Sequence, residues 1–493
     1  MSTPVLWILV PFVVGVMLFF LRRWYRTTVL IGSLTVIFLA ISAYFLPVNE
    51  LIRLGPLAFK INESFDILGR TLFLGVEDRP LVILIYTLAG FWFSAAFEAR
   101  AGRMFVPIGL TLLAVWMAAL TVEPFLYAAL LLELAVLLSI PLLSPPGSPP
   151  GRGIIRYLIF QTFGMPFILL TGWLLAGVES SPGNLDLVVQ ASLLLGFGFL
   201  FLLAIVPFHS WLPMVAEQAH PYPAGFIFFF LPLMVSLFGL KFIDQYAWLR
   251  QSVALYEALR LGGVLMIVIG GAWAALQRHM GRIMGFAILT GIGAMLVAIS
   301  VSPSLELFFA MQVPRSLSLA VWALGLSILQ RKAIRPLPAI AEVELLEQPQ
   351  PPALSRVDSL LFRNLQGVGR QMPLATAAAT LAALSFAGYP ILAGFPVYQA
   401  IWRNLARQAP LLAALALFGS LSLGAGGLRS LAVLVMGSAE SPWRISEHWL
   451  TASFLIVGIL LIILLGLFPQ WVLPYAATIS QVFTQITSPP LSP

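Results

Sequence analysis

Cysteine is absent from this chain of 493 residues, and histidine occurs only four times. Without thiolates the chain forms no disulfide, holds no thiolate-bound iron–sulfur cluster and uses no cysteine nucleophile. The four histidines are spread along the sequence and leave little for a metal site. Neither a dinucleotide-binding glycine fingerprint nor a phosphate-binding loop is present. We therefore expect no metal, no other cofactor and no catalytic centre in this chain.

Charged residues are scarce as well. Only 10% of the residues are Asp, Glu, Lys or Arg, whereas soluble domains contain about 25%. Hydrophobic residues make up 60% of the chain, and the mean hydropathy is +0.97. So few charges cannot cover a surface that faces water, which predicts an all-α integral membrane protein. The net charge of +7 fits membrane-flanking loops, and we expect no nucleic-acid partner.

Lysine is the rarest charged residue. Lys60, Lys241 and Lys332 are the three lysines, against 24 arginines. This imbalance matters because a buried ammonium group can release a proton near neutral pH, whereas a guanidinium in a protein stays protonated.

Fourteen apolar segments approach or exceed the length of about 20 residues that a membrane-spanning helix requires. The predicted spans are 4–21, 27–47, 80–98, 104–122, 124–142, 154–176, 187–206, 222–243, 256–276, 282–301, 304–329, 373–404, 410–437 and 448–473.

Basic residues collect in every second loop, if the fourteen helices alternate in direction. They are Arg22, Arg23, Arg26, Arg100, Arg103, Arg152, Arg278, Arg282, Arg331, Lys332 and Arg335. Cytoplasmic loops are enriched in Lys and Arg. The pattern predicts that both termini lie on the non-cytoplasmic side of a bacterial inner membrane or an equivalent energy-converting membrane.

Two long polar stretches divide the chain. Residues 48–79 are expected on the outer surface, and 357–368 are expected to form a short interfacial helix within a proline-rich linker. The expected units are three N-terminal helices with the outer segment (1–103), a first five-helix repeat (104–243), helices 9–11 (244–330), a cytoplasmic linker (331–372) and helices 12–14 (373–493).

Prolines interrupt several apolar spans and free backbone carbonyl groups. Pro207 and the pair Pro390 and Pro396 mark breaks about 185 residues apart, a spacing that fits two five-helix repeats, each with one broken helix. Pro232 and Pro314 lie within or beside other spans. Each proline taken alone is equally consistent with a packed kink.

Ionisable residues inside a membrane are costly unless paired or hydrated, so each is a functional hypothesis. Glu133 lies in the middle of span 124–142, where it either exchanges protons or is a protonated, hydrogen-bonded carboxyl group. Arg315 follows Pro314 and either pairs with freed carbonyls or serves transport. Lys241 and Asp244 lie near the outer end of their helix and are expected to snorkel.

A polar cluster follows Pro207. His209 and His220 flank Glu217 in the sequence. Either the histidines brace the helix break through hydrogen bonds, or the cluster titrates near neutral pH.

At these residues the sequence resembles the antiporter-like membrane subunits of respiratory complex I, membrane hydrogenases and multisubunit cation/proton antiporters. The resemblance extends over about residues 100–440. It rests on PFHSWLP (207–213), AHPYPAG (219–225), QRHMGRIMGFAIL (277–289), MPLATAAATLAALSFAGYPILAGF (372–395) and the position of Glu133. It implies two inverted five-helix repeats and proton movement along a line of charged side chains in mid-membrane.

The chain departs from that family at most of the charged positions. The family's lysine positions correspond here to Leu202 and to Leu233 or Met234, its helix-11 lysine to Arg315, and its helix-12 charge to Tyr398. Among the charged positions that the resemblance implies for transport, only the glutamate, Glu133, is the same residue type in this chain.

The sequence thus predicts a membrane-arm subunit of a complex-I-like, ion-translocating assembly, with proton movement coupled to redox chemistry or antiport. Its proton path would be degenerate, through Glu133, His209, water and Arg315, and its role partly structural. The alternatives are a subunit of a multisubunit cation/proton antiporter and a companion subunit in an inorganic-carbon uptake complex. The expected partners are other membrane subunits and lipid. The sequence decides neither the assembly nor the ion.

Overall fold

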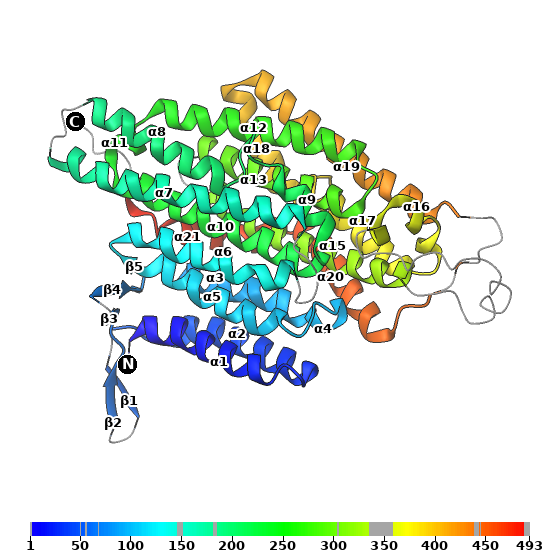
Figure 1. The fold of residues 1–493 in the computed structure, drawn as a ribbon, viewed down its shortest axis with the longest axis horizontal. Coiled ribbons are helices and arrows are strands. Elements are labelled where there is room, and N and C mark those ends of the chain that lie inside the picture. Colours follow the sequence, from blue (N-terminus) through cyan, green and yellow to red (C-terminus); the bar gives the residue numbers. More distant parts are fainter. Residues whose placement is uncertain are drawn as a thin grey trace.

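The computed structural model describes residues 2–49, 51–54, 57–67, 69–144, 151–180, 185–302, 305–334, 358–437, 443 and 445–487. Its helices run roughly along one direction and form an elongated bundle (Figure 1). Within these residues, the strands lie at one end of the bundle.

The fourteen predicted spans correspond to fourteen apolar helical stretches in the described part of the chain. Nine are long enough to cross a membrane: α2 (Tyr25–Phe45), α6 with the turn before it (Phe125–Leu143), α7 (Arg152–Ser180), α10 (Pro221–Gln245), α12 (Val253–Leu276), α13 (Met280–Val301), α14 (Glu306–Ala310) continuing into α15 (Gln312–Ile334), α19 (Pro410–Val435) and α20 (Trp449–Leu467). Five are shorter: the N-terminal π-helical turn (Val5–Leu9) with α1 (Val10–Phe20), α3 (Arg79–Ser94), α5 (Phe105–Thr121), α8 (Leu185–Leu202) and α17 (Pro373–Phe386).

The two predicted helix breaks are present. The helix that ends with α8 resumes as α9 (Trp211–Gln218), and α17 resumes as α18 (Phe395–Gln408). Pro207 and Pro390 lie inside the breaks, whereas Pro396 is the second residue of α18. A proline is tolerated there because that position has no intrahelical N–H bond to lose. Pro396 therefore marks where the second half-helix begins.

Gly388 allows the second break to approach α18 closely. Its φ is +78°, a left-handed conformation that L side chains rarely adopt. A Cβ atom at this position would lie 2.8 Å from the Cβ of Tyr398. The glycine thus brings the unwound backbone against the helix that carries Tyr398.

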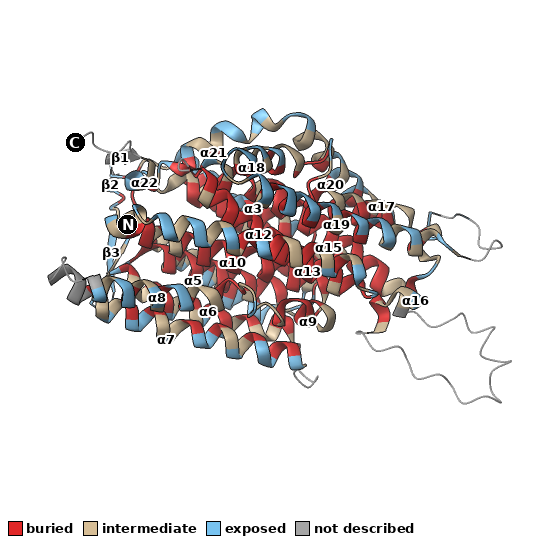
Figure 2. Cartoon of the chain, turned by 90° about the horizontal axis from the view of Figure 1, so that it is seen from above, coloured by how far each residue is buried: buried red, intermediate tan, exposed pale blue. Residues whose placement is uncertain are grey.

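The centre of the bundle is formed by α10, α13 and α15 (Figure 2). Every residue in the most apolar window of α13 is buried, against 22% for α20. Small residues allow the close packing around α13. Gly263 of α12 and Gly293 of α13 face each other, and a Cβ on either would come within 2.6 Å of the other's carbonyl oxygen. Such close backbone approach is a common way for membrane helices to associate.

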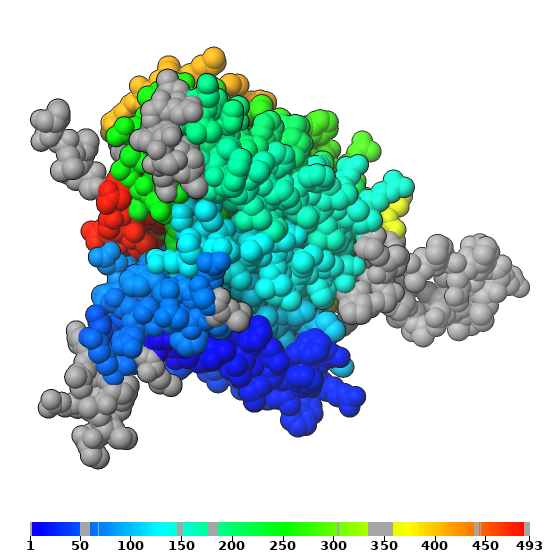
Figure 3. All heavy atoms as spheres, turned by 60° about the vertical axis from the view of Figure 1, so that its left-hand side comes forward, coloured from blue at the N-terminus to red at the C-terminus, as the bar shows by residue number. Residues whose placement is uncertain are grey.

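The outer segment 48–79 contains strands, which the sequence analysis did not predict. Strands β1 (Leu51–Leu54) and β2 (Leu57–Lys60) form one antiparallel pair, and β3 (Ser64–Ile67) and β4 (Arg70–Phe73) form another. β4 also pairs with β5 (Val122–Glu123), which directly follows α5. This segment and the C-terminal helices α21 (Leu473–Ser480) and α22 (Thr484–Thr487) gather at the same end of the bundle (Figure 3).

The predicted interfacial helix over 357–368 is replaced by three short helical turns. These are Asp358–Leu360, α16 (Phe362–Leu365) and Val368–Arg370. Leu360 and Leu365 are fully buried, so this stretch packs against the bundle through these side chains. Residues 335–357 of the linker, with Arg335 and Val357, lie outside the described residues.

Candidate functional site

Glu133 lies on α6 at the edge of the bundle. Its Oε1 atom accepts a hydrogen bond of 2.7 Å from the Thr162 hydroxyl on α7, and its side chain is half-buried. Leu130, Leu134 and Leu137 on the same helix are exposed. The carboxyl group therefore lies on a helix whose exposed residues are otherwise leucines.

Arg315 lies in the core, on the first turn of α15, and is only 5% exposed. Its guanidinium carbon lies 5.5 Å from the centre of the Phe229 ring, and Nη1 donates to the sulfur of Met295. Nε and Nη2 are buried without a hydrogen-bond partner among the residues that the structure describes. Within the same residues, the only ion pair closer than 4 Å joins Arg282 to Glu217, so no such carboxylate neutralises Arg315.

A small cavity with mostly apolar walls adjoins Arg315. Its volume is about 10 Å³, roughly the space that one water molecule requires. Tyr398, Ser318 and Ser385 line it, and the two serine hydroxyl groups lie 2.8 Å apart. The second broken helix thus places two hydroxyl groups in the cavity beside Arg315, because Ser385 lies just before the break and Tyr398 follows it on α18.

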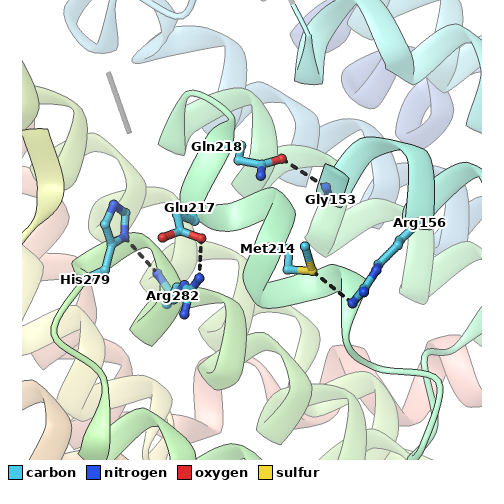
Figure 4. Close-up of polar contacts among 7 residues, drawn as sticks. All are labelled: Gly153, Arg156, Met214, Glu217, Gln218, His279 and Arg282. Atoms are coloured by element: carbon cyan, nitrogen blue, oxygen red, sulfur yellow. Dashed lines mark hydrogen bonds and ion pairs between the residues drawn. The ribbon is translucent and has the colours of Figure 1, made fainter. Parts of the chain in front are cut away.

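The first break does not bring His209, Glu217 and His220 together as a titrating cluster. α9 is eight residues long, about 12 Å, and separates His209 before it from Glu217 near its end. Glu217 instead pairs with Arg282 of α13 at 2.7 Å, and His279 accepts a hydrogen bond from the Arg282 backbone (Figure 4). His220 caps α10 by accepting from the Tyr222 N–H at 3.3 Å.

His209 remains a candidate proton-path residue. It is half-buried in the break, and its Nδ1 atom is buried without a hydrogen-bond partner in the described part of the chain. The motif PFHSWLP predicted that His209 lies in the helix break. The structure confirms this position and shows in addition that the side chain is half-buried.

Lys241 does not snorkel into open solvent. Its ammonium group donates to the carbonyl of Leu120 at the end of α5 and shares a small cavity with Asp78. Burial raises the pKa of Asp78, while the hydrogen bond from the Gly75 N–H opposes that rise. Asp244 accepts bonds of 2.9 Å from the backbone of Gln485 and Ile486, which fixes α22. We interpret both residues as holding the strand-bearing end of the bundle together.

The positions where the resemblance implied lysines are closed and apolar. Leu202 ends α8, and its carbonyl accepts from the Gln161 side chain at 3.2 Å. Leu233 and Met234 are fully buried within α10. Tyr398, the substitute at the last position, lies in the cavity of Arg315.

Sequence reasoning missed two arrangements here. The Glu217–Arg282 pair joins residues 65 positions apart, and the cavity that Arg315 and Tyr398 share joins α15 to α18. No pattern along the chain reports such contacts, because they depend on how the helices pack. From the sequence, Arg282 contributed only to the prediction of which loops are cytoplasmic.

Comparison with known proteins places these features in a family. The family model described as "NADH:quinone oxidoreductase/Mrp antiporter, TM" matches residues 175–424, just over half of the chain. The "NADH-quinone oxidoreductase subunit 14" of Thermus thermophilus is 28% identical over 366 residues, which cover 71% of this chain and 75% of that protein.

Two further matches agree. The "NADH-quinone oxidoreductase subunit N" of Rhodococcus opacus is 25% identical over 65% of this chain, but the match spans only 58% of that protein's length. A chain of the archaeal membrane-bound sulfane sulfur reductase has the same fold, with a TM-score of 0.77 and 15% identity over 99% of this chain and 98% of that one. The chain belongs to the NADH:quinone oxidoreductase/Mrp antiporter family of membrane proteins.

Proposed function

We propose that the chain is a membrane-arm subunit of a complex-I-like assembly and contributes two separate charged positions to proton translocation instead of a continuous line of lysines. One observation carries this proposal. Glu133 lies at the bundle edge and Arg315 in the core, while Leu202 and Leu233, the positions at which the resemblance implied lysines, are buried and apolar. Protons need polar side chains or water to move, so an apolar barrier divides the path.

Glu133 is the position that we assign to proton exchange. A carboxyl group in mid-membrane can take up and release a proton when water or another polar group reaches it. Polar groups continue inward from α6 and α7, where the hydroxyls of Ser139 and Tyr157 lie 2.9 Å apart and Gln161 is buried.

The same carboxyl group indicates where a partner subunit binds. A half-buried Glu133 among exposed leucines would otherwise face hydrocarbon, which is costly. A neighbouring membrane subunit on the α6–α7 face would cover it and continue the polar path. Covering the face also removes Leu130, Leu134 and Leu137 from lipid.

Arg315 acts as a fixed positive charge. A guanidinium does not release its proton in proteins, so Arg315 cannot relay protons by titrating. It can orient a water molecule in the adjoining cavity and attract negative charge, with Tyr398 as a hydroxyl donor and acceptor. A proton would then move through water and hydroxyl groups beside a constant charge.

A subunit of a multisubunit cation/proton antiporter is the second candidate. It is supported by the matching family model, whose description names both kinds of assembly. An inorganic-carbon uptake complex is the third, suggested only by the loss of the lysines. The three differ in their soluble partners.

Co-purification tests the assembly. A tagged chain extracted in mild detergent should carry other membrane subunits of the family, together with redox-active soluble subunits, when the bound proteins are identified by mass spectrometry. Because the chain contains no cysteine, Leu137→Cys on α6 can be cross-linked selectively. We expect a cross-link to a membrane subunit at Leu137→Cys and none at the matched exposed position Leu265→Cys on α12.

The co-purified proteins decide among the three assemblies. Recovery of membrane subunits without redox subunits would favour the antiporter, and recovery of the chain alone would refute the assembly.

We also infer that both termini lie on the non-cytoplasmic side, which rests on the basic loops at the opposite end of the bundle. Arg23→Cys between α1 and α2 and Gln481→Cys after α21 are exposed reporters. A membrane-impermeant maleimide added to intact spheroplasts should label Gln481→Cys and should label Arg23→Cys only after permeabilisation. The opposite labelling would reverse the orientation.

A further inference from the structure

A basic pocket of about 580 Å³ lies where α2, α4 (Ala96–Ala99), α15 and α20 come together at the end of the bundle opposite the strands (Figure 1). Five cationic side chains line it: Arg26, Arg100, Arg103, Arg331 and Lys332. They come from three separate loops and helix ends. The fold therefore concentrates positive charge that the sequence distributes over about 300 residues.

Each of the two carboxylates in the pocket has one oxygen bonded to another group, while Oε2 of Glu447 is buried without a hydrogen-bond partner in the described residues. Glu98 accepts a hydrogen bond from the Thr451 hydroxyl. Glu447 accepts from the N–H groups of Leu374 and Ala375 at 2.9 and 3.3 Å and so caps α17. Neither lies within 4 Å of a cationic group as an ion pair, as far as the described residues extend.

Several of the cations are available to a ligand. Arg26, Arg100 and Arg103 are exposed, and Lys332 is half-exposed. The guanidinium of Arg26 lies 5.2 Å from the Phe97 ring centre, while Arg331 donates to the Glu98 carbonyl oxygen at 2.9 Å. Arginine side chains at such a site can bind phosphate oxygens through two parallel hydrogen bonds.

The walls of the pocket continue into surfaces suited to acyl chains. On α2, Leu30 and Leu34 follow Arg26 at intervals of four residues, and both are exposed. On α20, Leu450 and Thr451 line the pocket, and Phe454 and Val457, one to two turns further along, are exposed. A soluble phosphate compound would use the cations alone, whereas a phospholipid would use the cations and both apolar surfaces.

We propose that this pocket binds an anionic phospholipid, with its phosphate groups among Arg26, Arg100, Arg103 and Lys332 and its acyl chains along α2 and α20. Basic pockets between membrane helices on the cytoplasmic side bind such head groups. The volume admits a head group with one or two phosphates. This lipid would join the N-terminal helix α2 to the C-terminal helix α20, which are far apart in the sequence. The site depends on membrane insertion and not on the proposed transport role.

Lipid binding to the delipidated full chain tests the proposal. Cardiolipin, phosphatidylglycerol, phosphatidylcholine or inorganic phosphate is added in detergent, and binding is followed by native mass spectrometry and by the shift in thermal unfolding. We expect cardiolipin and phosphatidylglycerol to bind at least about tenfold more tightly than phosphatidylcholine, and inorganic phosphate not to bind. The double variant Arg100→Gln, Arg103→Gln should lose roughly 30-fold in affinity, because each juxtamembrane arginine strengthens lipid binding severalfold.

Two controls separate a specific site from general charge. Arg403→Gln with Arg407→Gln removes two exposed arginines from α18, outside this pocket, and should leave lipid binding unchanged. Arg100→Lys with Arg103→Lys keeps the charge and should retain most of the affinity. Equal binding of phosphatidylcholine, equal binding of free phosphate, or the same loss in both glutamine variants would overturn the proposal.

Discussion

Replacing Glu133 with glutamine should reduce proton pumping by the intact assembly at least about tenfold without loss of the subunit. The amide oxygen of glutamine can still accept the hydrogen bond from Thr162, so the contact between α6 and α7 is kept. The substitution removes only the ability to take up and release a proton. Pumping is measured in proteoliposomes with a pH-sensitive dye, and assembly is checked by the yield of the purified complex.

Two controls make the Glu133 result specific. Glu306→Gln changes an exposed carboxylate at the start of α14 and should leave pumping unaltered. Glu133→Asp keeps the titratable group and should retain part of the rate. Pumping at the wild-type rate in Glu133→Gln would remove this chain from the proton path, while the assignment to the assembly would stand on co-purification.

Replacing Arg315 with methionine should have the opposite combination of effects: a more stable subunit and slower transport. The buried guanidinium has two nitrogen atoms without partners among the described residues, and a buried unsatisfied polar group costs about 1–3 kcal/mol, more when it is charged. Methionine is shorter but apolar and flexible, so it can pack against Met295 and Phe229 without a polar group to satisfy. We expect the melting temperature of the purified subunit to rise, and proton pumping to fall about tenfold.

Arg315→Lys distinguishes a fixed charge from a merely bulky side chain. The lysine variant keeps a positive charge but can release its proton, since burial lowers the pKa of an ammonium group. Transport should therefore be restored relative to Arg315→Met and should become dependent on pH. A melting temperature that falls in Arg315→Met while transport per assembled complex stays normal would show that Arg315 is structural.

The spans and breaks could be predicted from the sequence because their causes are local. About 20 apolar residues suffice to cross a membrane, and backbone hydrogen bonds must then close within each segment. Pro207 and Pro390 remove such bonds, so the positions of the breaks follow as well. Glu133 and Arg315 could be identified as candidates for a similar reason, since an ionisable residue within an apolar segment is visible in the local sequence alone.

The outer segment and the linker were harder to predict. Residues 48–79 are mixed in polarity, and β4 is held by β5, which follows a helix about 50 residues later in the chain. The short turns after residue 357 are buried against the bundle, although their composition suggested a membrane surface. In both cases a distant part of the chain determines the local structure.

Hydropathy and motifs along the chain were enough to identify a helical membrane protein of the antiporter-like family, with one retained carboxyl group and no line of lysines. Which helices are central follows from helix packing, because α13 and α20 are both apolar all round and hydropathy does not distinguish protein from lipid as a neighbour. It also paired Glu217 with Arg282, placed Tyr398 beside Arg315 and gathered the arginines of three loops into one pocket. Such contacts join residues far apart in the chain, and helix packing alone brings them together.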